Sequence, residues 1–142
     1  MILSWRVIIT VEYMDLKEIP EELETVLKTA VRALDDRKAE DLRVLYVGEL
    51  SSITDFFVLA TGNSEPHLKA LINTVSREMK DKKISLVGSD LGQGTGWAVI
   101  DAFDVMIHMF LPEQREFYQL DDLWKDAESV DPEVFLPVEA GN

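Results

Sequence analysis

The sequence predicts a single α/β domain in which helices flank a mixed sheet. A length of 142 residues suits one domain with a buried core, and 46% hydrophobic with 29% charged residues is a globular composition. Helical and strand-like patterns of apolar residues also alternate along the chain, without an internal repeat. We expect an N-terminal extension at residues 1–16, the domain at 17–127 and a flexible acidic tail at 128–142.

The first elements expected are a short strand at Val7–Val11, inside the extension, and a helix that begins at Pro20. Proline is favoured at the first helical position, and the glutamates that follow it lie near the positive end of the helix dipole. Apolar residues then recur at three- and four-residue spacing as far as Leu34, which gives the helix one buried stripe.

Two strands and a second helix are expected next. The first strand is the short apolar run Leu42–Val47, and the second is Phe56–Ala60, whose continuous hydrophobicity is typical of a strand buried on both faces. A turn with a helix cap is predicted at Thr61–Ser64. The apolar residues from Leu68 to Met79 have the spacing of a second amphipathic helix.

The pattern that follows predicts mostly strands. A third strand is expected at Ile84–Val87, and the next segment, Gly88–Gly96, holds four glycines in nine residues and predicts a loop. Two further strands, Trp97–Ala102 and Asp104–Phe110, are close enough in sequence to form a tight hairpin.

The end of the chain predicts short helices and a frayed tail. A helical turn is expected from Pro112 and another over Leu120–Ala127, whereas the tail from Glu128 is acidic and interrupted by prolines. Arg115 is expected to pair with a strand carboxylate such as Asp104. Apolar residues at helix-like spacing are expected to close over the sheet: Phe117, Leu120, Leu123 and Trp124.

A formal net charge of −13 argues against direct nucleic-acid binding, because phosphates are bound by clustered Lys and Arg. If the protein works near RNA, we expect it to do so through a basic protein partner. Charge alone does not separate this reading from a solvated acidic surface. The absence of cysteine excludes disulfides and suits the cytoplasm. No stretch approaches the roughly 20 apolar residues of a membrane helix, so we expect no membrane insertion. The apolar stretch Met1–Val11 has its only basic residue, Arg6, in the middle of the run and not ahead of it, so we expect no export.

Three motifs have both a chemical and a simpler structural reading. Backbone N–H groups at Thr61–Ser64 could bind a phosphate at the helix start. However, no lysine follows as in a P-loop, and Ser64 as a helix cap explains the same residues.

Ser89 ahead of Asp101 and Asp104 is similar to a nucleotidyltransferase site, in which carboxylates converge on Mg²⁺. The two aspartates are three residues apart, whereas convergence on a strand needs a spacing of two. A divergent metal-dependent nucleotidyltransferase that uses Ser89, Asp101 and Asp104 is therefore kept as an alternative function.

The third motif is His108, which has only one other histidine in the chain, His67. A metal would need further histidine or carboxylate ligands beside it. We therefore expect His108 to be half-buried and hydrogen-bonded, and we expect no metal and no cofactor.

The strand that begins at Trp97 provides a candidate docking face. Because side chains alternate along a strand, Trp97, Val99 and Asp101 share one face, and Ala98 and Ile100 share the other. Turned outward, the first three would offer a basic partner an aromatic anchor, an aliphatic patch and a carboxylate. The spacing fits a tryptophan packed under a helix equally well.

Read together, several segments resemble the RsfS/Iojap family, from about Glu22 to Ala127 and in the family's order. No single segment is diagnostic, but the ordered set is specific. The segments are Glu49–Ser64, Gly96-Trp97 with Asp101, Asp104-Val105, His108, Arg115-Glu116-Phe117-Tyr118 and Leu123-Trp124.

The resemblance implies a nucleotidyltransferase-like fold without the transferase's active site, and hence no enzyme activity. Family members dock on the L-fourteen protein of the large ribosomal subunit, prevent joining of the small subunit and damp translation when nutrients are scarce. Several members are dimers, so the same face could also serve a homodimer. By position, the docking face would include Trp97, Val99 and Asp101, with Thr61, Gly62 and Ser64 in the adjoining loop. The supporting residues would be Asp104, His108, Arg115, Tyr118 and Trp124.

The chain departs from the family at Phe103, where members typically have glycine. Phenylalanine resists positive φ, so we expect a hairpin turn of another type, which affects the placement of Asp101 and Asp104. Residues 1–16 also fall outside the resemblance.

Overall fold

The computed structural model describes residues 13–137, so the strand expected at Val7–Val11 lies outside the described residues. Within this range the strands are β1 (Glu40–Tyr46), β2 (Phe56–Thr61), β3 (Gly88–Asp90), β4 (Trp97–Asp101), β5 (Val105–Phe110) and β6 (Glu128–Val130). The helical segments are η1 (Leu16–Glu18), α2 (Glu21–Asp36), α3 (Glu65–Asp81), α4 (Pro112–Tyr118), α5 (Leu120–Leu123) and η2 (Pro132–Phe135).

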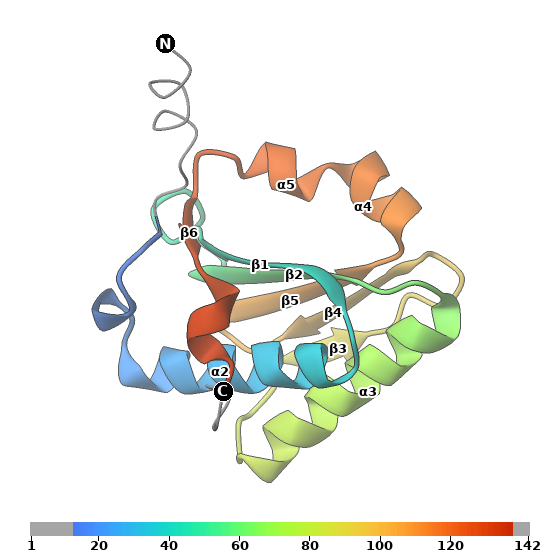
Figure 1. Cartoon of the computed structure of the whole chain (residues 1–142), viewed down its shortest axis with the longest axis horizontal. Coiled ribbons are helices and arrows are strands. Elements are labelled where there is room, and N and C mark those ends of the chain that lie inside the picture. Colours follow the sequence, from blue (N-terminus) through green and yellow to red (C-terminus); the bar gives the residue numbers. More distant parts are fainter. Residues whose placement is uncertain (1–12, 138–142) are drawn as a thin grey trace, which may run out of the picture.

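The six strands found in residues 13–137 form one mixed sheet in the order β3-β4-β5-β2-β1-β6. β2 and β5 are parallel, and the other neighbouring strands are antiparallel. α2 and α3 cover one face of the sheet, while α4 and α5 lie over the other (Figure 1). This arrangement confirms the predicted α/β domain with a mixed sheet. Its likeness to nucleotidyltransferases stays a prediction.

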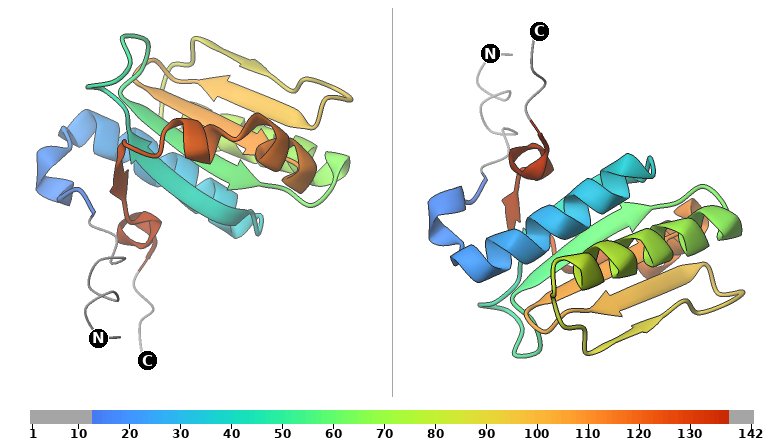
Figure 2. Two further views of the ribbon diagram at one scale, coloured as in Figure 1. Left: turned by 90° about the horizontal axis from the view of Figure 1, so that it is seen from above. Right: turned by 90° about the horizontal axis from the view of Figure 1, so that it is seen from below.

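Both long helices form where the sequence predicts them. α2 begins directly after Pro20 and carries three glutamates in its first turn. The Ser64 hydroxyl caps α3 by accepting the N–H of His67 at 3.2 Å, which confirms the cap reading of this turn. The two helices lie side by side across the sheet (Figure 2).

Apolar side chains of the described residues pack into two cores, one on each side of the sheet. The larger core joins α2, α3 and η2 to the strands, and the smaller one lies beneath α4 and α5. β2 is sandwiched between the cores, so all of its residues are buried, as its continuous hydrophobicity predicts. The fully or nearly buried members of the smaller core are Leu45, Val47, Phe57, Leu59 and Phe110.

Two predictions around the β4–β5 hairpin are wrong. The third strand is β3 at Gly88–Asp90, inside the expected loop, and residues Ile84–Val87 form no strand. Pairing with β4 creates this short edge strand, whatever the propensity of its own residues. Phe103 has a φ of 67°, so the hairpin turn uses the conformation usual for glycine. Strand pairing on both sides and a 3.0 Å hydrogen bond from the Phe103 N–H to Asp101 Oδ1 hold it there.

The expectation of a frayed tail from Glu128 is wrong as far as residue 137. β6 pairs antiparallel with β1, and Phe135 is only 1% exposed in the larger core. The Arg32 Nε donates to the backbone oxygen of Phe135 at 2.7 Å. At the other end, the Met14 N–H donates to the Ser129 oxygen at 2.7 Å and Tyr13 forms a bridge with Ser129, so these two residues also contact the sheet. The acidic, proline-containing sequence of residues 128–137 does not predict a strand, because β6 is stabilised by pairing with β1, which is distant in the chain.

Candidate docking face

The candidate docking face is the strand surface of Trp97, Val99 and Asp101, on the side of the sheet where α4 and α5 lie. All three side chains are half-buried, whereas Ala98 and Ile100 between them are fully buried under α3 on the other side. The predicted alternation along this strand is therefore confirmed. α4 and α5 cover the sheet only in part, which leaves these three residues accessible.

Trp97 combines a packed ring with an accessible part. Its ring centroid lies 4.5 Å from that of Tyr118 in α4 and 5.0 Å from that of Phe110 in β5. The indole Nε1 donates to Nδ1 of His108 at 3.1 Å. The indole is thus partly packed under α4, as expected for a tryptophan packed under a helix. It is also partly open to solvent, as an aromatic anchor of a docking face requires.

His108 lies beneath this face and links it to the smaller core. It is 7% exposed, more deeply buried than the half-buried position expected from the sequence, and burial lowers its pKa from 6.5 to about 4. Its ring meets that of Phe57 edge-on at a centroid distance of 5.0 Å, and Phe57 meets Trp124 at 5.1 Å. A continuous row of rings therefore runs across the sheet from Tyr118 to Trp124.

Neither histidine of the chain has the surroundings of a metal ligand. The His67 ring accepts the Asn63 N–H at its Nδ1 at 2.9 Å, and its Nε2 lies 2.7 Å from the Arg37 backbone oxygen. Within residues 13–137, no group of three or more His, Cys, Asp or Glu side chains could hold a metal ion. The hydrogen-bonded reading of His108 fits this geometry.

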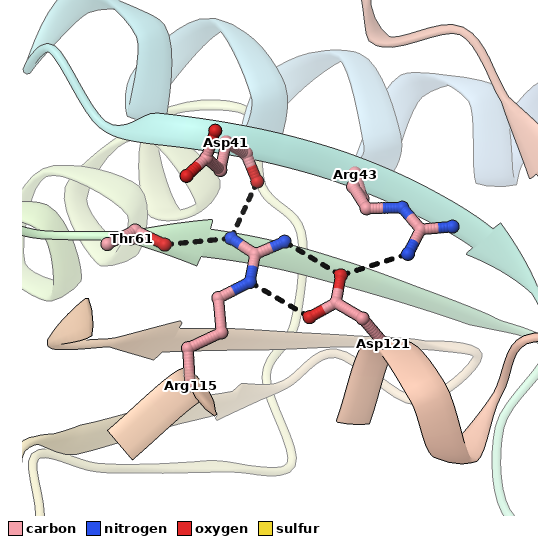
Figure 3. Close-up of polar contacts among 5 residues, drawn as sticks. All are labelled: Asp41, Arg43, Thr61, Arg115 and Asp121. Atoms are coloured by element: carbon pink, nitrogen blue, oxygen red, sulfur yellow. Dashed lines mark hydrogen bonds and ion pairs between the residues drawn. The ribbon is translucent and has the colours of Figure 1, made fainter. Parts of the chain in front are cut away.

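Arg115 anchors α4 through a polar network with Asp121, which corrects the expected pairing with Asp104 (Figure 3). Its Nη1 donates to the Asp41 backbone oxygen at 2.6 Å and to the Thr61 hydroxyl at 2.8 Å. Arg43 adds a second ion pair to Asp121 at 2.9 Å. Asp104 instead lies exposed at the hairpin turn before β5, whereas α4 and Arg115 follow the far end of that strand.

The pKa of Asp121 reflects opposing effects of its surroundings. Burial raises this pKa, but hydrogen bonds from Arg115 and Arg43 and the charges of both guanidinium groups outweigh that effect. The net result is a pKa below the usual 3.8. The carboxylate is therefore ionised at neutral pH and holds both arginines.

Of the three loop residues predicted to adjoin the docking face, Thr61 and Gly62 are buried and Ser64 is half-buried. Thr61 is level with Phe110 and Trp97 in the sheet register, yet it is 4% exposed beneath Arg115. Gly62 is buried against α3, where a Cβ atom would lie 2.9 Å from Leu68. Ser64 is occupied as the cap of α3. The contact of Thr61, Gly62 and Ser64 with a partner stays a prediction.

Exposed apolar residues of α4, α5 and the β1–β2 loop lie on the same side of the sheet as the face. Phe117 and Leu123 were expected to close over the sheet, but they are 78% and 69% exposed. The left-handed conformation of Gln119 breaks the helix between them, so a single helical periodicity does not apply. Leu120 and Trp124 do pack on the smaller core, as predicted. Leu50 and Ile53, which the sequence interpretation did not single out, are exposed in the β1–β2 loop and line a hollow of about 350 Å³ beside Trp124.

The sequence of residues 20–141 matches a family described as RsfS, ribosomal silencing factor during starvation. A ribosomal silencing factor RsfS from Chromobacterium violaceum is 35% identical over 103 residues, which span 72% of this chain and 84% of the relative. The chain belongs to the RsfS family. Membership confirms the resemblance drawn from the motifs and supports a ribosome-associated role in repressing translation.

Two further comparisons of this RsfS-family chain are informative. A crystal structure of a protein from Chromobacterium violaceum matches with a TM-score of 0.68 at 30% identity, over 91% of this chain and 95% of that one. A mouse protein named mitochondrial assembly of ribosomal large subunit protein 1 is 32% identical over 100 residues, or 66% of this chain and 42% of the mouse protein. The structural match extends the family likeness to the arrangement of the elements.

The geometry does not favour the metal-dependent alternative for this family member. Ser89 pairs with Ile100 across the β3–β4 ladder, and Gly88 pairs with Asp101. Because cross-strand partners share a face, the Ser89 and Asp101 side chains point to opposite sides of the sheet. Asp101 also uses one oxygen to accept the Phe103 N–H at 3.0 Å.

No helix within residues 13–137 has the length and apolar content of a transmembrane span.

Proposed function

We propose that this RsfS-family protein binds the large ribosomal subunit through its L-fourteen protein and sterically blocks association with the small subunit, which represses translation. The observation that carries the proposal is the family match over residues 20–141. The name of the mouse relative, which refers to assembly of the ribosomal large subunit, supports the choice of subunit. Binding in this mechanism fills space and involves no reaction, cofactor or metal.

The composition of the candidate docking face supports a basic protein partner. Trp97, Val99 and Asp101 offer an aromatic, an aliphatic and an anionic group side by side on one strand. Exposed Phe117 and Ile53 extend the apolar area around them. The net charge of −13 favours encounter with a positively charged surface and disfavours direct binding to ribosomal RNA. Such a face matches an exposed ribosomal protein better than it matches nucleic acid.

Co-sedimentation with purified large subunits tests the proposal. We expect the wild-type protein to sediment with free large subunits and to lower the yield of joined ribosomes when small subunits are added. Trp97→Ala should weaken binding about 30-fold or more, because a central aromatic anchor carries much of the energy of an interface. Circular dichroism establishes that the variant is folded. Equal binding by wild type and Trp97→Ala would refute this docking face.

The carboxylate of Asp101 needs a matched pair of variants. Asp101→Asn keeps an oxygen that can accept the Phe103 N–H but removes the charge, so weaker binding would report electrostatics alone. Asp101→Lys should weaken binding further. Asp81→Lys makes the same charge change at the end of α3, on the opposite side of the sheet, and should bind like wild type. If Asp81→Lys weakens binding equally, net charge and not the proposed face is responsible.

Two further parts of the proposal have their own tests. We place the protein in the cytoplasm, in a form that can dimerise through the docking face in competition with the ribosome. Sedimentation at two concentrations would detect the dimer, and Trp97→Ala should weaken the dimer.

We also propose that the protein has no enzyme activity. Calorimetry with Mg²⁺ and nucleotides tests this, and saturable binding of nucleotide would count against the absence of activity.

A further inference from the structure

The hydrogen bond between Trp97 and His108 determines how the indole lies on the sheet. An indole has a single polar hydrogen, and in Trp97 it is donated to Nδ1 of His108 at 3.1 Å. The two residues are diagonal neighbours on β4 and β5, because Val99 is the direct partner of His108. The bond therefore ties a half-buried ring to a buried one across the strand pair.

The protonation of His108 follows from this bond. Nδ1 accepts the indole hydrogen and so carries no proton, which leaves the proton of the neutral ring on Nε2. Nε2 is buried and has no hydrogen-bond partner among the described residues. An unsatisfied buried donor carries a desolvation cost that a hydrocarbon side chain of similar size would avoid. Compared with such a hydrocarbon side chain, the imidazole provides one additional group at this position, the hydrogen-bond acceptor Nδ1.

Neighbouring rings fix the position of that acceptor. Phe57 meets the imidazole edge-on with centroids 5.0 Å apart, and Phe110 stacks on it at 6.0 Å with an interplanar angle of 12°. This packing holds the plane of the imidazole, and the bond from the Trp97 indole selects the ring edge that carries the acceptor. Trp97 itself is only half-buried, so packing alone constrains its ring less than it constrains His108.

We propose that His108 is a positioning residue of the docking face: it holds the Trp97 indole in the orientation in which its accessible part meets the partner. The inference rests on the proposed function, because it assigns Trp97 to the contact. His108 itself is too deeply buried to touch the partner. Its contribution is a docking face that is ordered before binding, which lowers the entropic cost of association.

The test compares His108→Leu with His108→Asn. Leucine has a similar volume and no acceptor, whereas the Oδ1 of asparagine stands where Nδ1 of histidine does. In the full chain labelled with ¹⁵N, the Trp97 Nε1–H signal is assigned with Trp97→Phe. We expect hydrogen exchange at this Nε1–H to rise about tenfold in His108→Leu and affinity for purified large subunits to fall about tenfold. His108→Asn should restore most of both.

Ile107→Val is the matched control, because Ile107 is buried on the same strand and faces the opposite core. It should lower stability without changing the indole exchange rate or the affinity. The inference is overturned if His108→Leu releases the indole but binds large subunits like wild type, or if His108→Asn restores the bond without restoring binding. If the wild type itself does not bind large subunits, the proposed function fails, and the exchange data still report on the His108–Trp97 bond separately.

Discussion

Arg115 of α4 and Asp121 of α5 form a two-point ion pair, in which Nε meets Oδ1 and Nη2 meets Oδ2 at 3.0 Å each. The remaining nitrogen, Nη1, bonds to the Asp41 backbone oxygen in β1 and the Thr61 hydroxyl in β2. One guanidinium therefore joins two short helices to two strands. Neither α4 nor α5 has a fully buried residue, so this polar anchor acts together with the partly buried Leu120 to hold the two helices over the sheet.

Replacing Arg115 by lysine should lower the free energy of unfolding by about 1–3 kcal/mol, because an ammonium group cannot reproduce the planar fork that meets the carboxylate at two points. Chemical denaturation measures the change. Arg43→Lys is the control: Arg43 makes one bond to the same carboxylate and its side chain is 38% exposed, so the cost should stay below about 1 kcal/mol. A larger effect at Arg43 than at Arg115 would contradict this account of the network.

His108 should make the protein less stable in mild acid. Its pKa is about 4 in the folded chain and 6.5 as a free side chain, so between these values the unfolded state binds more protons. Stability should therefore fall as the pH is lowered from 6.5 to 4, by about 3 kcal/mol at most. Denaturation midpoints across this range measure the loss, and it should shrink in His108→Asn. Asp121 adds a further loss only below pH 3.8, because its folded pKa is lower still.

Phe103→Gly should stabilise the protein by about 0.5–1 kcal/mol. A φ of 67° strains any residue with a Cβ, and this gain outweighs the greater freedom that glycine has in the unfolded chain. The Phe103 side chain is 60% exposed, so little apolar burial is lost. Phe103→Ala keeps the strain and should not stabilise. Thermal unfolding of both variants decides the matter, since equal melting temperatures would remove strain as the explanation.

Phe135→Ala should destabilise the protein by about 3–5 kcal/mol, because it opens a cavity in the larger core. A residue in a frayed tail would have no such effect. Val134→Ala, next to it and 46% exposed, should stay within about 0.5 kcal/mol of wild type. Urea denaturation compares the two variants, and similar small effects at both positions would mean that η2 contributes little to the fold.

Local patterns were enough to predict most of the architecture. The two long helices follow from the spacing of apolar residues, the buried central strand from its continuous hydrophobicity, and the shared face of Trp97, Val99 and Asp101 from strand alternation. Each of these signals depends on residues within a few positions of one another, so the sequence alone contains it. The family resemblance depends on the order of several motifs along the chain, which the sequence alone also contains.

Only the tertiary structure decided which distant groups meet. It paired Arg115 with Asp121 instead of Asp104, turned Phe117 and Leu123 outward, and placed Phe135 in the core. Strand pairing and helix packing fix these contacts through residues far apart in the chain, and they also hold Phe103 in a conformation that its own side chain disfavours. The bond from Trp97 to His108 belongs with them, because it requires two strands in register.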